Sequence, residues 1–181
     1  PVLVTMIFDE KGKLLTGGTV DSTVAMLEGL RVDALGVNCG LGPKQMHPII
    51  KRLTEVSSLP IIVNPNAGLP RSENGKTVFD IAPEEFAELM EEIAGMGVQA
   101  LGGCCGTTPE HLRRMIEKCR QLPFAPAVPK HRSVVSSFSQ AVEIGPKPVI
   151  IGERINPTGK SKFKAALREN NIEYILGEGM A

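Results

Sequence analysis

Apolar and polar residues follow one another along the first two thirds of the chain in blocks that predict a repeated strand–helix unit. Short apolar runs are typical of strands in a parallel sheet. After each run, apolar residues recur at three- or four-residue spacing, which indicates a helix with one buried face. The strand-like runs lie at 2–8, 33–38, 60–64 and 98–103, and the helical patterns at about 20–30, 46–56, 83–95 and 109–119. The first of these runs, at 2–8, is expected to be a buried strand.

Local signals mark where some of these helices begin. Thr108 suits an N-cap and Pro109 the first helical position, so the fourth helix has the clearest start. Pro48 falls in the second helical pattern, where proline is tolerated only in the first turn because it lacks a backbone N–H. We therefore expect the second helix to begin only shortly before Pro48.

Four strand–helix units in about 120 residues predict an α/β fold with parallel strands and right-handed crossovers. A closed eight-stranded (β/α)8 TIM barrel needs ~250 residues, so half of one is present. The chain also begins at Pro1 inside a strand-like run, and we expect a missing N-terminal part.

The composition changes after the fourth helix. Residues 122–147 are rich in proline and serine and predict an interdomain linker, partly ordered. Residues 148–181 then read as a strand, a loop and a helix, too short for a domain but suited to the start of one. The predicted organisation is a first domain over 1–121, the linker, and the opening β–α unit of a second domain.

Charge and composition limit the partners. The 20 basic and 20 acidic residues cancel, which argues against a nucleic acid or a membrane surface as the main partner. No apolar run approaches the ~20 residues of a membrane span. Four cysteines in a chain of this size favour reduced thiols in the cytoplasm over a disulfide scaffold. The three histidines are too scattered for a ligand set and are expected at the surface.

Three of the cysteines follow predicted strands, Cys39 in GVNCGLGP and the adjacent Cys104 and Cys105 in GGCCGTTPEHL. A parallel α/β fold keeps its chemistry at the carboxyl ends of its strands, so these thiols should cluster there. Three thiolates with one open position are typical of a catalytic zinc site. The alternative is that all three are buried apolar cysteines. Cys119 lies in the apolar stripe of a helix and is expected in the core.

The motifs GVNCGLGP, NPNAGLP and GGCCGTTPEHL together resemble the homocysteine methyltransferase family. Their order and spacing resemble the homocysteine half of cobalamin-dependent methionine synthases. Residues 1–121 resemble the second, C-terminal half of the homocysteine-binding barrel. Residues 148–181, which contain IGERINPTG, resemble the start of the pterin-binding barrel that follows it.

The resemblance implies roles for individual residues. Cys39, Cys104 and Cys105 would be the zinc ligands. Asn66, in NPNAG, would lie beside them as a substrate contact or a fourth metal ligand, although a loop asparagine that makes a turn is the alternative. Glu153 and Asn156, in GERIN, would contact the pterin, with a capping role as the alternative.

The same resemblance implies a methyltransferase that uses zinc to methylate the thiol of homocysteine and yields methionine. Methylcobalamin, held by another domain of the same longer polypeptide, would deliver the methyl group, with methyltetrahydrofolate as its source. Two alternatives remain: a stand-alone homocysteine S-methyltransferase with another small methyl donor, and an inactive fragment with a structural zinc–thiolate site. Without the first half of the barrel, we expect this chain alone to be poorly stable or inactive.

Overall fold

The computed structural model of the chain describes residues 1–145, 147–149 and 155–180. The chain divides into two compact units, Pro1–Ile144 and Gly145–Ala181. The first unit has a mixed α/β architecture built on a parallel sheet, and the second contains two helices.

The sheet of the first unit has the strand order β1-β2-β3-β6, and every neighbouring pair is parallel. Its strands are β1 (Leu3–Met6), β2 (Ala34–Asn38), β3 (Ile61–Asn64) and β6 (Ala100–Leu101). The helices that follow them in turn are α1 (Val20–Gly29), α2 (Pro43–Val56), α3 (Pro83–Gly95) and α4 (Pro109–Cys119). The predicted strand–helix alternation and the parallel pairing are confirmed.

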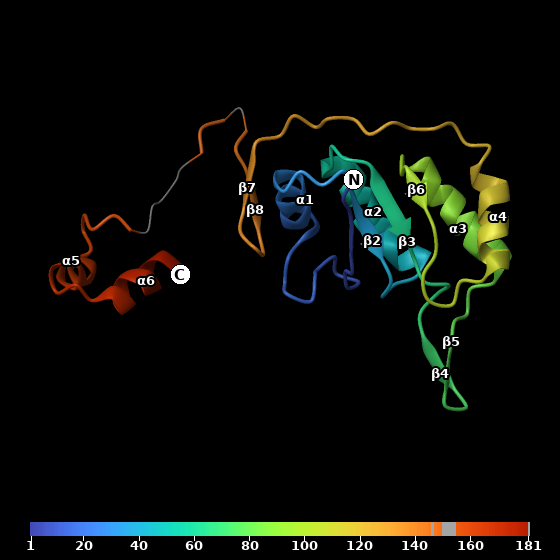
Figure 1. Cartoon of the computed structure of the whole chain (residues 1–181), viewed down its shortest axis with the longest axis horizontal. Helices are drawn as coiled ribbons and strands as arrows, with labels where there is room; N and C mark the ends of the chain where they lie inside the picture. Colours follow the sequence, from blue (N-terminus) through green and yellow to red (C-terminus); the bar gives the residue numbers. More distant parts are fainter. Residues whose placement is uncertain (146, 150–154, 181) are drawn as a thin grey trace. The chain divides into compact units, whose positions relative to one another are not determined.

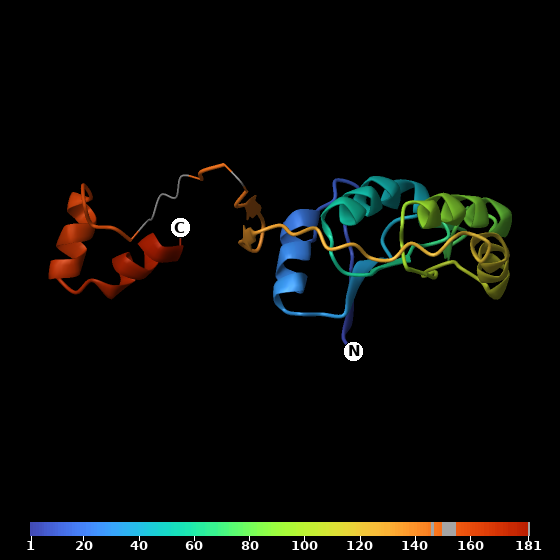
Figure 2. The ribbon, with the colours of Figure 1, turned by 90° about the horizontal axis from the view of Figure 1, so that it is seen from above.

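The helices share one face of the sheet, because strands added successively at one edge by right-handed crossovers place every crossover on the same side. Figure 2 shows α1, α2 and α3 arranged along this side. The buried stripes that the sequence predicted for α1 and α2 pack in one core cluster with Leu35, Val37 and Val63 of the strands. Ile62 and Asn64 point to the other face and are only half-buried, so the two faces of the sheet differ.

Two local predictions are wrong. The first strand was expected to be buried, yet Leu3 is 59% exposed, because β1 pairs with β2 alone and forms an edge of the sheet. Pro48 does not lie in the first turn of its helix, because α2 already begins at Pro43. Pro48 lies inside α2 on its exposed side, so its ring does not have to be accommodated in the core.

A β-hairpin follows β3, in a stretch for which the sequence analysis predicted neither a strand nor a helix. Its strands are β4 (Arg71–Glu73) and β5 (Lys76–Val78). The turn residues Asn74 and Gly75 have φ values of 51° and 73°, the left-handed conformation that a two-residue hairpin turn of this type requires. The Asn-Gly pair is itself a hairpin signal that could have predicted this element. Figure 1 shows the hairpin projecting beyond the sheet.

Residues 122–144, called the strap from this point, belong to the first unit and pack on the part of it that precedes them. The strap ends in a hairpin of β7 (Val134–Ser136) and β8 (Ala141–Glu143) that contacts α1. Gln99 Nε2 donates to the Ala125 carbonyl at 2.8 Å, and the Lys130 N–H donates to Ser58 Oγ at 3.0 Å. Gln99 and Ser58 precede β6 and β3, so the strap crosses the amino ends of the strands, opposite the β4–β5 hairpin (Figure 1). The interdomain role of 122–147 stays a prediction.

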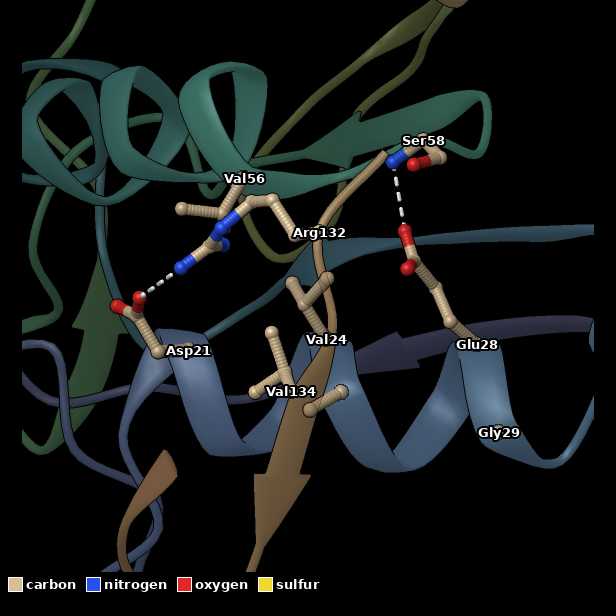
Figure 3. Close-up of a pocket in the computed structure, with 9 residues that line it drawn as sticks. Asp21, Val24, Glu28, Gly29, Val56, Ser58, Arg132 and Val134 are labelled. Atoms are coloured by element: carbon tan, nitrogen blue, oxygen red, sulfur yellow. Dashed lines mark hydrogen bonds and ion pairs between the residues drawn. The ribbon is translucent and has the colours of Figure 1, made fainter. Parts of the chain in front are cut away.

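A pocket of about 200 Å³ lies where the strap meets α1 and the end of α2 (Figure 3). Arg132 of the strap reaches Asp21 at 3.7 Å, and the Glu28 carboxylate accepts the Ser58 N–H at 2.6 Å. These charged groups line the pocket together with Val24 of α1. Its lining contains none of the four cysteines.

The second unit contains α5 (Ser161–Arg168) and α6 (Ile172–Met180). Phe163 and Ala166 of α5 are buried. The sequence predicted a helix here but not the separate α6. The strand expected before it falls largely on residues outside the described part, so the start of a second barrel stays a prediction. Among the described residues, no helix is long and apolar enough to cross a membrane.

Candidate metal centre

Cys39 lies one residue beyond β2, at a sharp turn of the backbone. Cys39 and Gly40 have φ values of 55° and 72°, and residues other than glycine rarely adopt the left-handed region. The Cys39 N–H donates to the Asn64 carbonyl at 3.0 Å, which continues the pairing of β2 with β3 up to the cysteine. The hydrogen bonds between β2 and β3 therefore fix the position of the Cys39 backbone, from which the thiol extends.

Cys104 and Cys105 follow β6 and are fixed by the loop that follows β3. The Cys104 N–H donates to the Pro65 carbonyl at 2.8 Å. The Cys105 N–H donates to Asn66 Oδ1 at 3.1 Å, and the Cys105 carbonyl accepts the Ala67 N–H at 2.9 Å. The three residues that follow β3 thus form hydrogen bonds with the backbone N–H groups of both cysteines and with the Cys105 carbonyl.

Gly106 allows the chain to turn directly after the cysteine pair. Its φ is 79°, and a Cβ at this position would overlap the ring of Phe79. Phe79 lies at the base of the β4–β5 hairpin. The close approach of this ring to the Gly106 backbone explains why a glycine stands here.

The three thiols meet at one point. The Cys39 and Cys105 sulfurs are 3.6 Å apart, the Cys104 and Cys105 sulfurs 3.9 Å, and all three sulfurs lie within 4.8 Å of one another. A tetrahedral zinc with Zn–S bonds of ~2.3 Å separates its sulfur ligands by about 3.8 Å. Bonded sulfurs would be only ~2.04 Å apart, and all four cysteines are free thiols. The donor set and its spacing fit zinc.

The pKa values show why three thiolates need a cation here. Burial raises the pKa of Cys39, but hydrogen bonds from the Gly40 backbone and from the other two thiols bring it below its ordinary value. Burial, and next the hydrogen bond to Cys39, raise the pKa of Cys104 to about 11. Cys39 therefore loses its proton more readily than Cys104, and further negative charges in the cluster would repel one another.

Accessibility is uneven around the cluster. Cys105 is exposed, whereas Cys39 and Cys104 are partly buried. An exposed edge leaves room for one more ligand beside the three sulfurs, which is what separates an open metal site from a closed structural one.

Asn66 lies beside the sulfurs, with only 3% of its surface exposed. Its Oδ1 accepts the Cys105 N–H, and its side chain also hydrogen-bonds to Cys39 and lowers the pKa of that thiol. Asn66 therefore joins the two cysteine loops. Its amide oxygen accepts one backbone N–H and keeps a second lone pair, so its role as a substrate contact or fourth metal ligand stays a prediction.

The remaining candidates lie elsewhere. Glu153 is outside the described residues. Asn156 precedes α5, and its Oδ1 accepts the Thr158 N–H at 2.9 Å.

Cys119 packs against the core cluster as expected, and burial raises its pKa. The expectation of surface histidines is wrong for His111, which is 7% exposed because its ring fills the space between α4 and the loop before α3.

Comparison with known proteins identifies the family. Residues 1–119 match the homocysteine S-methyltransferase family. The chain belongs to this family. It is also 34% identical to a methionine synthase of Mycobacterium leprae (strain TN) and 31% identical to one of Mycobacterium tuberculosis (strain ATCC 25618 / H37Rv), over 97% of the chain in both cases. It spans 15% of the length of these relatives.

Solved structures of the homocysteine methyltransferase MmuM from Escherichia coli share the fold. The metallated form is 25% identical with a TM-score of 0.50, and the alignment covers 65% of this chain and 35% of that one. The apo form gives 24% identity and a TM-score of 0.51, over 64% of this chain and 39% of that one. The parallel sheet and its helices therefore correspond to part of a TIM-barrel-like homocysteine methyltransferase domain.

Proposed function

We propose that this chain forms the zinc-binding part of an enzyme that methylates the thiol of homocysteine and yields methionine. The observation that carries the proposal is the convergence of Cys39, Cys104 and Cys105 at zinc-like spacing in a member of the homocysteine S-methyltransferase family. When zinc is bound, it favours the thiolate form of a substrate thiol at neutral pH.

The residues of the chain contribute binding and orientation. Cys39, Cys104 and Cys105 hold the ion, and the exposed side of Cys105 is where the substrate thiol enters. Asn66 keeps the two cysteine loops in register and donates a hydrogen bond toward Cys39. The glycine turns at Gly40 and Gly106 let the thiols face a common centre.

The methyl donor in this proposal is methylcobalamin, carried by another domain of a longer polypeptide and recharged by methyltetrahydrofolate. The similarity to methionine synthases supports it, because that similarity extends over 97% of the chain and so beyond the family match at 1–119. Residues 148–181 would then begin the pterin-binding domain, with Glu153 and Asn156 as pterin contacts and 122–147 as the connection. Free thiols agree with a cytoplasmic location.

Cobalt substitution tests the open site directly. Co²⁺ is added to the reduced full chain, and the absorption spectrum is recorded before and after homocysteine is added. We expect thiolate-to-cobalt bands at one equivalent and a further spectral change with homocysteine, because the substrate sulfur would complete the ligand set. Cobalt bands that homocysteine leaves unchanged would favour a closed, structural site. Methionine serves as the control compound, since its methylated sulfur cannot form a thiolate.

A further inference from the structure

We propose that His111 is a positioning residue for the cysteine pair, acting through Ile81 and Ala67 on the peptide of Cys105. The inference rests on the proposed metal site and adds a residue outside the cysteine loops to it. His111 touches none of the three sulfurs. Its effect comes from fixing the loop that in turn holds Cys105.

The hydrogen bonds of the imidazole define its state. Nδ1 lies 3.2 Å from the Thr108 nitrogen and accepts its N–H, and the Thr108 hydroxyl oxygen lies 2.8 Å from the same Nδ1. Nε2 lies 2.9 Å from the Ile81 carbonyl oxygen, to which it donates. A neutral ring protonated on Nε2 satisfies both contacts, since one nitrogen accepts while the other donates. The ring also meets Phe86 edge-to-face, with 5.5 Å between centroids.

A continuous series of hydrogen bonds runs from this ring to the metal loop. The Ile81 N–H donates to the Ala67 carbonyl at 3.0 Å, and the Ala67 N–H donates to the Cys105 carbonyl at 2.9 Å. Thr108, at the other end of the ring, lies three residues after Cys105. The two sides of the His111 ring therefore connect to the chain beside the cysteine pair, one through Thr108 and the other through Ile81 and Ala67.

This arrangement fits what a metal centre needs. Adjacent thiolates can share one ion only if the backbone between them is held in a strict conformation, and groups beyond the ligands commonly provide that constraint. Asn66 and Ala67 hold the two sides of the Cys105 residue, and the Ile81 contact fixes Ala67. His111 is the buried side chain that secures Ile81 to α4.

Two amide substitutions separate the two bonds of the ring. His111→Asn places an amide near the position of Nδ1, so it can accept from Thr108 but cannot reach Ile81. His111→Gln places an amide near the position of Nε2 and can still donate to Ile81. Both lose the ring contact with Phe86, so that loss is common to the pair. His47→Asn, at an exposed histidine of α2, is the control for histidine replacement elsewhere.

The measurements are Co²⁺ affinity by chelator competition, the thiolate-to-cobalt bands, and thermal unfolding of the metal-free full chain by circular dichroism. We expect His111→Asn to bind cobalt about tenfold more weakly, as is usual when an outer partner of a metal site is lost. We also expect altered charge-transfer bands in His111→Asn, with His111→Gln restored toward wild type and His47→Asn unchanged.

The outcomes distinguish the two proposals. A wild-type chain without thiolate-to-cobalt bands overturns the metal site and this role with it. Normal bands and affinity in His111→Asn overturn the positioning role alone. Equal weakening in both His111 variants overturns the link through Ile81, because only the ring contact with Phe86 is lost equally in the two.

Discussion

At the carboxyl ends of the strands, the loops that carry the cysteines contact one another through backbone hydrogen bonds and the buried amide of Asn66. At the amino ends, the strap joins α1 through charged side chains that are only partly exposed, among them Arg132 (22%) and Asp21 (28%) (Figure 3). Both regions join segments that are distant in the sequence. They differ in how strictly the contacts restrict the positions of the segments that they join.

The difference follows from the environment of the contacts. A backbone hydrogen bond between two short loops leaves little freedom, and its loss leaves a polar group without a partner. A partly exposed ion pair must order both of its side chains, and solvent partly screens it, so its contribution to stability is small. The first kind of contact suits a site that must hold three sulfurs at set distances. The second suits a segment that only has to lie against the surface.

Loss of a proposed ligand should have the largest effect. Cys105→Ser removes the sulfur that lies within 4 Å of both others, and we expect zinc affinity to fall by more than about 100-fold, beyond the roughly 10–100-fold cost of losing an outer partner. Cys119→Ser is the matched control, because this thiol packs against the core. The measurement is zinc retained after dialysis against a chelator. Retention of one equivalent by Cys105→Ser would contradict the assignment.

Asn66→Ala should have an intermediate effect. It should lower the stability of the fold and leave the three cysteine ligands in place. It removes the acceptor of the Cys105 N–H, and we expect the free energy of unfolding of the metal-free chain to fall by about 1–2 kcal/mol in urea. Thr107→Val is the comparison within the same loop. It removes the bond from Oγ1 to the Cys104 carbonyl, which still accepts the Thr107 N–H at 3.2 Å.

Thr107→Val should therefore cost less than Asn66→Ala. The opposite order would mean that the amide of Asn66 does not hold the cysteine loop.

Asp21→Asn should have the smallest effect, because it removes a carboxylate that pairs with Arg52 of α2 and, at 3.7 Å, with Arg132 of the strap. The hydrogen bond from Arg52 comes first among the causes that hold the pKa of Asp21 below its ordinary value, and Arg132 adds to it. A lowered pKa in the folded chain means that the charged form stabilises the fold above about pH 4 and that this stability is lost as the pH falls further.

We expect Asp21→Asn to cost less than about 1 kcal/mol at pH 7, because the ion pairs are partly exposed. The cost should disappear in acid. Urea unfolding at several pH values provides the measurement. Glu10→Gln, at an exposed loop residue, is the control for net charge. An effect of Asp21→Asn that does not change with pH would show that the charge is not responsible.

Much of the first unit could be predicted from local signals. The stripe in α2 and the start of α4 at Pro109 follow from side-chain periodicity and capping, which depend on neighbours within a few residues. The hairpin at 71–78 also had a local signal in Asn74 and Gly75. The burial of His111 had a local signal in its four-residue spacing from Met115, but its contacts with Ile81 and Phe86 form only when α3 and α4 pack together.

The sequence by itself determined the strand–helix order, the parallel fold class and the placement of three cysteines after strands, because each depends on short-range patterns. The tertiary structure decided that the sulfurs lie at zinc-like distances, that Asn66 and Ala67 hold the two sides of the Cys105 residue, and that the strap is part of the first unit. These features depend on which segments, tens of residues apart, the packed sheet and helices bring into contact, and no short-range pattern records that distance.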